Sequence, residues 1–358
     1  MKVSGQGGDL AFRGSDQWEE RIVHDKMLGD KYDAVVVGGG PAGLGAGLVL
    51  ARARRSVLVI DSAESSPGLV EHSHDHLERV RVNRADLVAA GRMAVRDHGG
   101  EVAVGTVASV EAIDQPESSF RVRLANGHTV QSRRVLIATG AVIALPDVPG
   151  LEERWGRDVL QCPHCQGWEL RDQAVGVLAT GPTAVAVALT FRQWTADVTL
   201  FLHTGPEPGE LGWQQLAARG ISVVDGEVTG LEVNGEDHLT GVRLHSGKVI
   251  NRQALVVTPE VRARTEILSD LGAKPLDQDG DIPGAQIPGA TSVPGVWVTG
   301  SSAAAGDVAA AISADLITED LRLALATHRR RDPFSAEVEQ QVSDLVLGDR
   351  RHGLSAKS

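Results

Sequence analysis

The chain has 358 residues, of which 42% are hydrophobic, so it is longer than one hydrophobic core usually organises and two domains are expected. Its formal net charge is -12, which argues against binding to nucleic acid or anionic lipid, because both would repel it. We read no segment as a signal peptide or a membrane span. We therefore expect a cytoplasmic protein with neither nucleic acid nor a membrane as a partner.

The first motif lies near the N-terminus, after a polar and glycine-rich stretch. From Tyr32 the chain reads YDAVVVGGGPAGLGAGLVLARARRSVLVIDSAE, which is the strand, glycine turn, helix and strand of a parallel βαβ unit. Gly38, Gly40 and Gly43 have the G-x-G-x-x-G spacing that permits a tight turn, close approach of a pyrophosphate and close helix packing. Asp61 ends the second strand, where its carboxylate can bind a ribose. We predict a dinucleotide site here; the alternative is a purely structural glycine turn.

Strands, turns and helices alternate along the rest of the chain. Strand patterns occupy 101–113, 119–130 and 133–141, with a hairpin signal at Asn126-Gly127. A second βαβ pattern, QAVGVLATGPTAVAVALTFRQWTADVTLFLH, follows roughly 140 residues after the first. The pattern predicts an α/β fold with two Rossmann-like domains. We expect the closing strand VWVTG and the helix that continues through Leu325 to return to the first domain, because each half otherwise lacks a closing element.

The two cysteines of the chain are separated by two residues, in Cys162-Pro163-His164-Cys165. Such a pair can close a small disulfide ring, and the motif lowers the thiol pKa so that one sulfur can attack at neutral pH. One alternative is a zinc site, which would need the histidines of His72-Ser73-His74-Asp75-His76, since there is no second cysteine pair. The other alternative is two inert thiols. The spacing favours reversible two-electron chemistry.

Three segments resemble the FAD-contacting segments of pyridine-nucleotide disulfide oxidoreductases. They are the GGGPAG turn, the segment Ile137–Ala141 (IATGA) and the closing VPGVWVTG, in the family's order. The C-x-x-C lies shortly after the second segment, as in low-molecular-weight thioredoxin reductases. The resemblance implies a thioredoxin-reductase-like fold with FAD as cofactor. It also implies that Cys165 lies against the flavin, and that Cys162 exchanges with the sulfur of the substrate.

The same resemblance assigns domains and cofactor contacts. We expect an extension (1–31), a discontinuous FAD-binding domain (32–146 and 292–330), an inserted NAD(P)-like domain with the cysteines (147–291) and a C-terminal tail helix (331–358). The residues predicted to contact FAD are Gly38, Gly40, Pro41, Ala42, Gly43, Asp61, Ala138, Thr139, Gly140, Gly300 and Ser301.

The chain departs from the family pattern in three places. Ala179 stands where the second nucleotide turn should have its first glycine, and no arginine pair follows the second strand, so the pattern argues against NADPH. Gln166 replaces the acid that serves as proton donor; because an amide cannot transfer protons, His164, Glu169 or another histidine must act as the base if one is needed. Ser301 replaces the acid after the final glycine, so one usual flavin contact is missing.

An intact first site and dithiol beside an altered second site resemble the dithiol oxidases of gliotoxin- and holomycin-type pathways. This resemblance implies an enzyme that oxidises a small-molecule dithiol through the C-x-x-C and FAD and passes the electrons to oxygen. A disulfide reductase running in the opposite direction, and a flavoprotein fold with a non-redox role, are the alternatives. Because the resembled family dimerises, we expect a homodimer.

Two further features are open at this stage. Trp168 is interpreted either as a wall of the substrate pocket or as a buried packing residue. The tail FSAEVEQQVSDLVLGDRRHGL has apolar residues at helical spacing, which predicts an amphipathic helix that docks on the body or on a second subunit.

Overall fold

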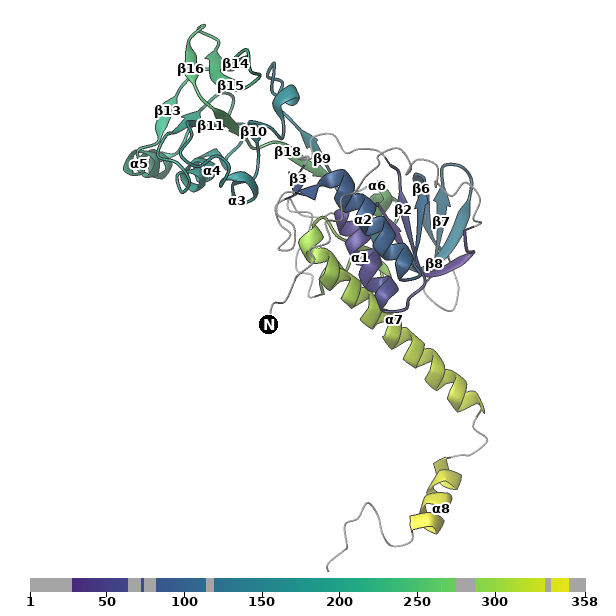
Figure 1. Ribbon diagram of the computed structural model, residues 1–358. Helices are drawn as coiled ribbons and strands as arrows, with labels where there is room; N and C mark the ends of the chain where they lie inside the picture. Colours follow the sequence, from purple (N-terminus) through teal and green to yellow (C-terminus); the bar gives the residue numbers. More distant parts are fainter. Residues whose placement is uncertain are drawn as a thin grey trace, which may run out of the picture.

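The computed structural model describes residues 28–63, 72–73, 82–113, 119–264, 266–274, 287–331 and 336–347. The predicted extension therefore lies almost wholly outside the described residues, as do His74, Asp75 and His76 of the histidine cluster. Within the described ranges the chain forms two lobes, one built around a mixed sheet and the other around a parallel sheet (Figure 1).

The first lobe is organised by a seven-stranded sheet. Its strand order is β5-β2-β1-β8-β7-β6, and β19 pairs in parallel with β8. The strands are β1 (Lys31–Val37), β2 (Val57–Asp61), β5 (Glu101–Val104), β6 (Val107–Ile113), β7 (Ser119–Leu124), β8 (Thr129–Ile137) and β19 (Val296–Val298). β1 and β2 are apolar runs because helices and strands cover both of their faces. The hairpin predicted at Asn126-Gly127 joins β7 to β8, with Gly127 at φ +89.

Helices cover one face of this sheet. They are α1 (Pro41–Arg52), α2 (Arg84–Asp97) and α7 (Ser302–Arg331), and α1 packs against both of the others. Leu50, Leu136 and Ile312 are completely buried between helices and sheet. On the other face, Phe120 and Val122 of the antiparallel strands form a second core with Leu268 of the short helix α6 (Glu266–Asp270). The closing strand and helix therefore complete the first lobe, although the whole second lobe separates them from β8 in the sequence.

The second lobe repeats the parallel arrangement on a smaller scale. Its five-stranded sheet has the order β10-β17-β11-β12-β13. The strands are β10 (Val159–Leu160), β11 (Val175–Leu178), β12 (Val198–Phe201), β13 (Ser222–Val224) and β17 (Ala254–Val257). On one face of the sheet lie α4 (Ala184–Phe191) and α5 (Glu210–Ala218). The antiparallel sheet of β14 (Val228–Val233), β15 (Leu239–Leu244) and β16 (Val249–Asn251) covers the other face.

Two antiparallel strands connect the lobes. β9 (Ala141–Ala144) pairs with β18 (Glu260–Ala263), and the register joins Ala141 to Ala263. After β9 the chain enters the second lobe through a short 3-10 helix (Glu152–Arg154), and after β18 it returns to the first. A separate pair, β3 (His72–Ser73) and β4 (Val82–Asn83), precedes α2. These connections agree with an inserted second domain, but the exact domain boundaries stay a prediction.

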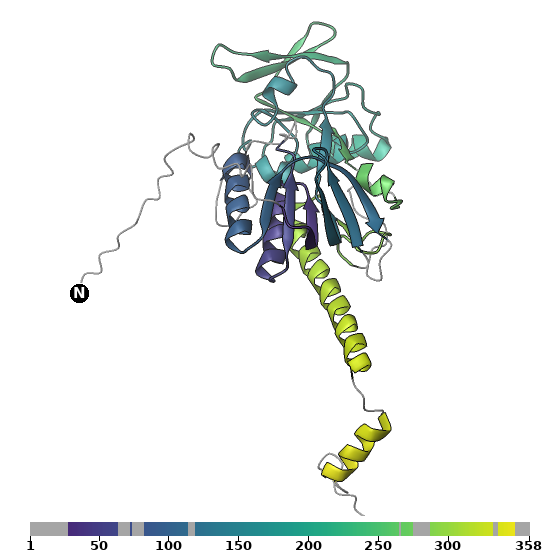
Figure 2. The same cartoon turned by 90° about the vertical axis from the view of Figure 1, so that its right-hand side faces the viewer.

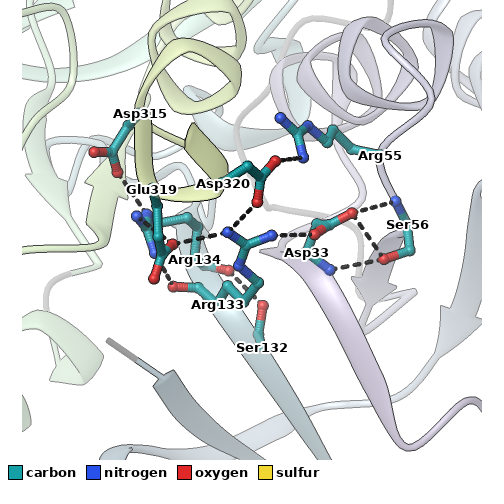
Figure 3. A network of polar contacts seen from close by, with 9 residues as sticks. All are labelled: Asp33, Arg55, Ser56, Ser132, Arg133, Arg134, Asp315, Glu319 and Asp320. Atoms are coloured by element: carbon teal, nitrogen blue, oxygen red, sulfur yellow. Dashed lines mark hydrogen bonds and ion pairs between the residues drawn. The ribbon is translucent and has the colours of Figure 1, made fainter. Parts of the chain in front are cut away.

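A network of ion pairs fastens α7 to the first sheet (Figure 3). Arg133 of β8 contacts Asp33 at 2.9 Å, Glu319 at 3.0 Å and Asp320 at 2.6 Å. Burial lowers the pKa of Arg133, but the hydrogen bonds to these three carboxylates together raise it by more than burial lowers it. The pKa of Arg133 is therefore raised above its ordinary value. The neighbouring Arg134 binds Asp315 and Glu319 from the same helix. The network thus connects β1, β8 and α7, which are distant in sequence.

The C-terminal part differs from expectation. α7 does not end near Leu325 but continues to Arg331, and its last turns extend away from the first lobe (Figure 2). The predicted tail helix is present as α8 (Ala336–Leu347), but every described side chain from 340 to 346 is exposed. The prediction that it docks on the body of the same chain is therefore wrong. Its docking on a second subunit stays a prediction.

Candidate active site

The first lobe contains a cavity of about 1000 Å³ at the carboxyl ends of its parallel strands. The segments that follow β1, β2, β5, β8 and β19 all contribute to the wall. This edge is where open α/β sheets bind ligands, and the volume is at the upper end of the range for cofactor pockets. The cavity therefore has the position and size expected for a dinucleotide.

The glycines of the first turn are fixed by contacts with the backbone. Gly38 has φ +116, and a Cβ there would lie 2.2 Å from the carbonyl oxygen of Ala138. A Cβ on Gly43 would lie 1.9 Å from the carbonyl oxygen of Gly38. Gly39, which the motif does not require, is also constrained, because its Cβ would overlap the side chain of Asp61 at 2.3 Å. Side chains are excluded here, so the turn can approach a ligand closely.

The N-terminus of α1 is a second feature that suits a dinucleotide. Its N-cap residue is Gly40, which offers no side-chain hydrogen bond, and Pro41 occupies the first turn. The free N–H groups and the helix dipole at such an end favour an anion. Gly40, Pro41 and Ala42 all line the cavity. This end of the cavity is suited to a pyrophosphate.

Asp61 lies on the wall of the cavity and is held by two contacts. Its Oδ1 accepts a hydrogen bond from the Ala63 N–H at 3.1 Å, and its Oδ2 forms an ion pair with Arg92 of α2. Arg92 also lines the cavity. No sequence pattern indicates this position, because an arginine in an amphipathic helix usually lies on its solvated face. The pair fixes the carboxylate that is predicted to bind a ribose.

Most of the other predicted cofactor residues also line the cavity. Ala138, Thr139, Gly140 and Gly300 do so. Gly43 lies behind the turn and serves helix packing. Ser301 is not a lining residue: its Oγ accepts a hydrogen bond from the Ala303 N–H at 3.1 Å, and its neighbour Ser302 lines the cavity instead.

The cysteine motif begins just beyond this cavity. Cys162 is half-buried and disulfide-bonded, and the chain has two cysteines in all; the side chain of Cys165 lies outside the described part. The short helix α3 (Pro163–Gln166) follows Cys162. It turns tightly because Gly167 donates to the Pro163 carbonyl at 2.7 Å, and a Cβ on Gly167 would clash with the Trp194 ring at 2.7 Å.

Gln161 connects the cysteine segment to the cavity. It precedes Cys162 and is the one described residue of the 151–200 segment that lines the cavity. Cys162 and His164 do not themselves line it. The predicted cofactor turns and the residue before the C-x-x-C segment therefore line the same cavity.

The residues around the motif are placed as follows. His164 is exposed and packs edge-on against Trp194, with 5.8 Å between ring centroids. Gln166 is 5% exposed, and its Oε1 has no hydrogen-bond partner among the described residues. Trp168 is 66% exposed, with the Arg171 guanidinium 4.5 Å from its ring centroid. The interpretation of Trp168 as a buried packing residue is therefore wrong.

The second nucleotide turn is poorly suited to NADPH. Ala179 is 1% exposed and packs against Gly205, where a Cβ would lie 2.7 Å from the Ala179 side chain. After β12, His203 adopts φ +45, and its Nδ1 accepts a hydrogen bond from the Val228 N–H at 3.1 Å. Burial lowers the pKa of His203, which favours its neutral form. The turn thus lacks both the open glycine and the cation that a 2'-phosphate requires.

Two other kinds of feature do not occur in the described ranges. No helix there combines the length and the apolar character that crossing a bilayer needs. In the same ranges, no three histidine, cysteine or acidic side chains are grouped so that they could hold a metal ion. His74 and His76 lie outside those ranges, so the zinc alternative keeps its status as an open interpretation.

Comparison with known proteins decides the family. Residues 32–328 match the family described as pyridine nucleotide-disulphide oxidoreductase. The chain belongs to this family. The chain is accordingly an oxidoreductase, and pyridine nucleotide-disulphide oxidoreductases bind a flavin.

Individual relatives agree with this assignment. The crystal structure of HlmI is 38% identical with a TM-score of 0.77, covering 83% of this chain and 96% of that one. Thioredoxin reductase tcpT of Claviceps purpurea (strain 20.1) is 28% identical over 284 residues, covering 76% of this chain and 87% of tcpT. A putative thioredoxin reductase TrxB from Bacillus anthracis, 24% identical with a TM-score of 0.72, covers 80% of this chain and 99% of its own, and supports the fold. This pyridine nucleotide-disulphide oxidoreductase is thus thioredoxin-reductase-like.

The residues present fit the flavin cofactor of the family. A glycine cradle that any Cβ would fill, an uncapped helix N-terminus and a fixed carboxylate line one cavity of sufficient volume. These are the features that a dinucleotide with a pyrophosphate and a ribose needs.

Proposed function

We propose that this protein is an FAD-dependent dithiol oxidase, which forms a disulfide in a small-molecule substrate through Cys162 and Cys165, with O2 as electron acceptor. The observation that carries the proposal is the position of Gln161. This residue directly precedes Cys162 and lines the same cavity as the predicted FAD-binding turns. The segment that carries the two cysteines would therefore begin at the wall of the cavity that would hold the cofactor.

The chain offers a contact for each part of FAD. The N-terminus of α1 would hold the pyrophosphate, and Asp61, fixed by Arg92, would bind the ribose of the adenosine. Thr139, Gly140 and Gly300 line the rest of the cavity and would contact the flavin. When bound, FAD accepts two electrons and two protons from a dithiol and transfers them to O2, which yields H2O2.

The sulfur chemistry follows from a disulfide at the C-x-x-C. A thiolate of the substrate attacks Cys162, which breaks the protein disulfide and forms a mixed disulfide while Cys165 leaves as a thiolate. The second thiolate of the substrate then attacks the substrate sulfur that is bound to Cys162 in the mixed disulfide. The cyclic disulfide product leaves, and Cys162 becomes a thiolate. The substrate loses two electrons and two protons, and the reduced pair Cys162 and Cys165 holds the two electrons.

Proton transfer is assigned to His164. Gln166 occupies the place of an acid in the resembled family, but an amide cannot exchange a proton at neutral pH. His164 is exposed, stands between the two cysteines in the sequence and keeps its ring in place against Trp194. It can therefore take the proton of an incoming substrate thiol.

The second lobe argues against NADPH as the electron partner of the flavin. Ala179 and Gly205 fill the space of a nucleotide turn, and His203 turns toward β14. The competing function is an NADPH-dependent disulfide reductase, which is favoured by the name thioredoxin reductase given to tcpT.

The two functions are separated by two measurements on the purified holoenzyme. Oxygen uptake with a small dithiol, at one O2 per disulfide formed, is the result expected of an oxidase. Anaerobic mixing with NADPH should leave the flavin absorbance unchanged. Rapid bleaching by NADPH, together with no oxygen uptake, would show that the reductase is the correct function.

A cysteine variant tests the sulfur chemistry directly. Cys162→Ser should reduce oxygen uptake below detection while the flavin content per chain stays that of the wild type. Trp213→Ala, which removes a side chain that is 40% exposed on α5 of the same lobe, is the control for a general disturbance of that lobe. Turnover retained in Cys162→Ser would exclude the proposed role of the thiol pair.

We also propose a cytoplasmic homodimer. Ile317, Leu321 and Leu325 of α7 are all at least 48% exposed and repeat every four residues, so they form one apolar stripe that a second subunit could cover. Mass measurement in solution by light scattering tests this: a monomer at micromolar concentration would contradict it.

A further inference from the structure

Arg264 is a cation in the cavity that the proposed mechanism does not use. It lies directly after β18, at the point where the chain returns from the second lobe. Its backbone is held by the segment after β8: the Arg264 N–H donates to the Gly140 carbonyl at 3.2 Å, and the Thr139 Oγ1 donates to the Arg264 carbonyl at 3.1 Å. The residue is half-buried and is one of those that line the cavity.

The charge of Arg264 is not balanced by the described wall. The charged residues among the lining residues are Asp61, Arg92 and Arg264, and Asp61 is paired with Arg92. No ion pair or side-chain hydrogen bond of the Arg264 guanidinium occurs within the described ranges. Other half-buried arginines of the fold, such as Arg133 and Arg252, have carboxylate partners. A guanidinium held in a cavity without a carboxylate favours a ligand that supplies one.

The hydrogen bonds of Arg264 are to other residues than those assigned to the pyrophosphate. The phosphates are assigned to the N-terminus of α1, and the ribose to Asp61 with Arg92. Arg264 is instead bonded to Thr139 and Gly140, and it lines the cavity together with Gln161, the residue before Cys162. Its place at the return from the second lobe, whose Gln161 lines the same cavity, favours the part of the cavity next to the cysteine segment, where a substrate would bind.

We propose that Arg264 is a specificity-determining residue that binds an anionic group, a carboxylate, on the dithiol substrate. The inference rests on the proposed function, because it assumes that the ligand is a dithiol substrate. It narrows the substrate class to dithiols that carry a negative charge. The planar guanidinium matches a carboxylate with two parallel hydrogen bonds, which a neutral amide of the same shape cannot replace.

Lipoate and lipoamide are a matched pair of probes, because they share the same cyclic disulfide and differ in a carboxylate against a neutral amide. Their dissociation constants are measured on the oxidised holoenzyme from the change in flavin absorbance, which requires no turnover. The wild type should bind lipoate about tenfold to a hundredfold more tightly than lipoamide, as expected for hydrogen bonds to a charged group. Arg264→Gln should bring the ratio close to one, and Arg264→Lys should give an intermediate value.

The control is Arg262→Gln. Arg262 lies on the same connecting strand and is exposed, and it is not a lining residue of the cavity. The variant makes the same change in net charge, so the preference for lipoate should stay that of the wild type. A loss of preference in both variants would indicate long-range attraction rather than a contact and would overturn the proposal.

Other outcomes are equally decisive. A preference that survives Arg264→Gln, or one that is absent from the wild type, contradicts the proposal. If Arg264→Gln weakens FAD binding to the apoprotein and leaves the ratio unchanged, the guanidinium holds a cofactor phosphate and the proposal is wrong. Oxygen uptake with the two reduced dithiols is measured in parallel: no uptake with either would refute the oxidase while the binding ratio still tests Arg264.

Discussion

The two nucleotide turns of this chain share a topology but differ in what their atoms permit. In the first turn, between β1 and α1, Gly38 and Gly43 are so close to neighbouring carbonyl oxygens that no side chain can be added. In the second, between β11 and α4, no heavy atom lies within 4 Å of the point that a Cβ on Gly181 would occupy. The first glycine position of this turn already carries the buried methyl group of Ala179. A retained glycine can thus be a functional constraint in one half and dispensable in the other.

The difference extends to the charges around each turn. The first turn faces a carboxylate that Arg92 holds in place. The second faces His203, whose neutral ring is occupied by the Val228 N–H. The fold alone therefore does not indicate which half binds a nucleotide; close contacts and charges available to a ligand do.

The largest expected effect is a difference between two glycine substitutions. Gly43→Ala places a methyl 1.9 Å from the Gly38 carbonyl oxygen, so we expect loss of bound flavin and a decrease of about 3 kcal/mol in the free energy of unfolding. Gly181→Ala should change that free energy by less than about 0.5 kcal/mol. The flavin-to-protein absorbance ratio and urea unfolding measure both. Equal effects of the two substitutions would remove the distinction between the turns.

The next effect concerns the ion pair at the wall of the cavity. Arg92→Met leaves Asp61 without its cation, so FAD affinity should fall about tenfold to a hundredfold, measured by titration of the apoprotein. Arg252→Met is the matched control, because Arg252 forms an ion pair with Asp197 at 2.9 Å in the second lobe. FAD affinity should stay unchanged in the control. A similar loss in both variants would point to general destabilisation.

A smaller effect is expected from pH in the second lobe. Because burial lowers the pKa of His203, its contribution to stability is complete above the unfolded pKa of about 6.5 and is lost as pH falls through the lower folded value. Hydrogen exchange of the β12–β14 amides should therefore accelerate between pH 8 and pH 5.5, after correction for intrinsic rates. His203→Asn tolerates the positive φ but should remove this dependence and cost about 1 kcal/mol. An unchanged pH dependence in the variant would show that another group titrates.

The smallest effect is expected at the anchor of α7 in the first lobe. The guanidinium of Arg55, and then that of Arg133, hold the pKa of Asp320 below its usual value. The stabilisation is present above an unfolded pKa of about 3.9 and is lost as pH falls through the folded value. Because the Asp320 side chain is 43% exposed, Asp320→Asn should cost about 1 kcal/mol or less at pH 7. Urea unfolding at pH 7 and pH 3 should show a smaller difference at the lower pH.

Local patterns predicted much of the fold and part of the site. Gly38, Gly43 and the Asn126-Gly127 turn could be recognised because their conformations follow from a few neighbouring residues. Asp61 was predictable from its place at the end of an apolar strand. Each of these features is encoded within one supersecondary unit.

The missed features depend on contacts between distant segments. Arg92 and Arg264 reach the cavity from α2 and from the return strand, and neither position has a local signature that separates it from a solvated arginine. Trp168 could not be assigned, because exposure depends on what packs over α3. The tail helix was predicted correctly as a helix, but periodicity indicates an apolar face without indicating what covers it.

The ion pairs of Arg133 have a consequence for synthesis of the protein. Asp33 leaves the ribosome early, whereas Glu319 and Asp320 leave almost three hundred residues later. The first lobe must therefore wait with part of one sheet face uncovered until the second lobe, which is continuous in sequence, has emerged. A nascent chain stalled before α7 should hold a folded second lobe beside a protease-sensitive first one.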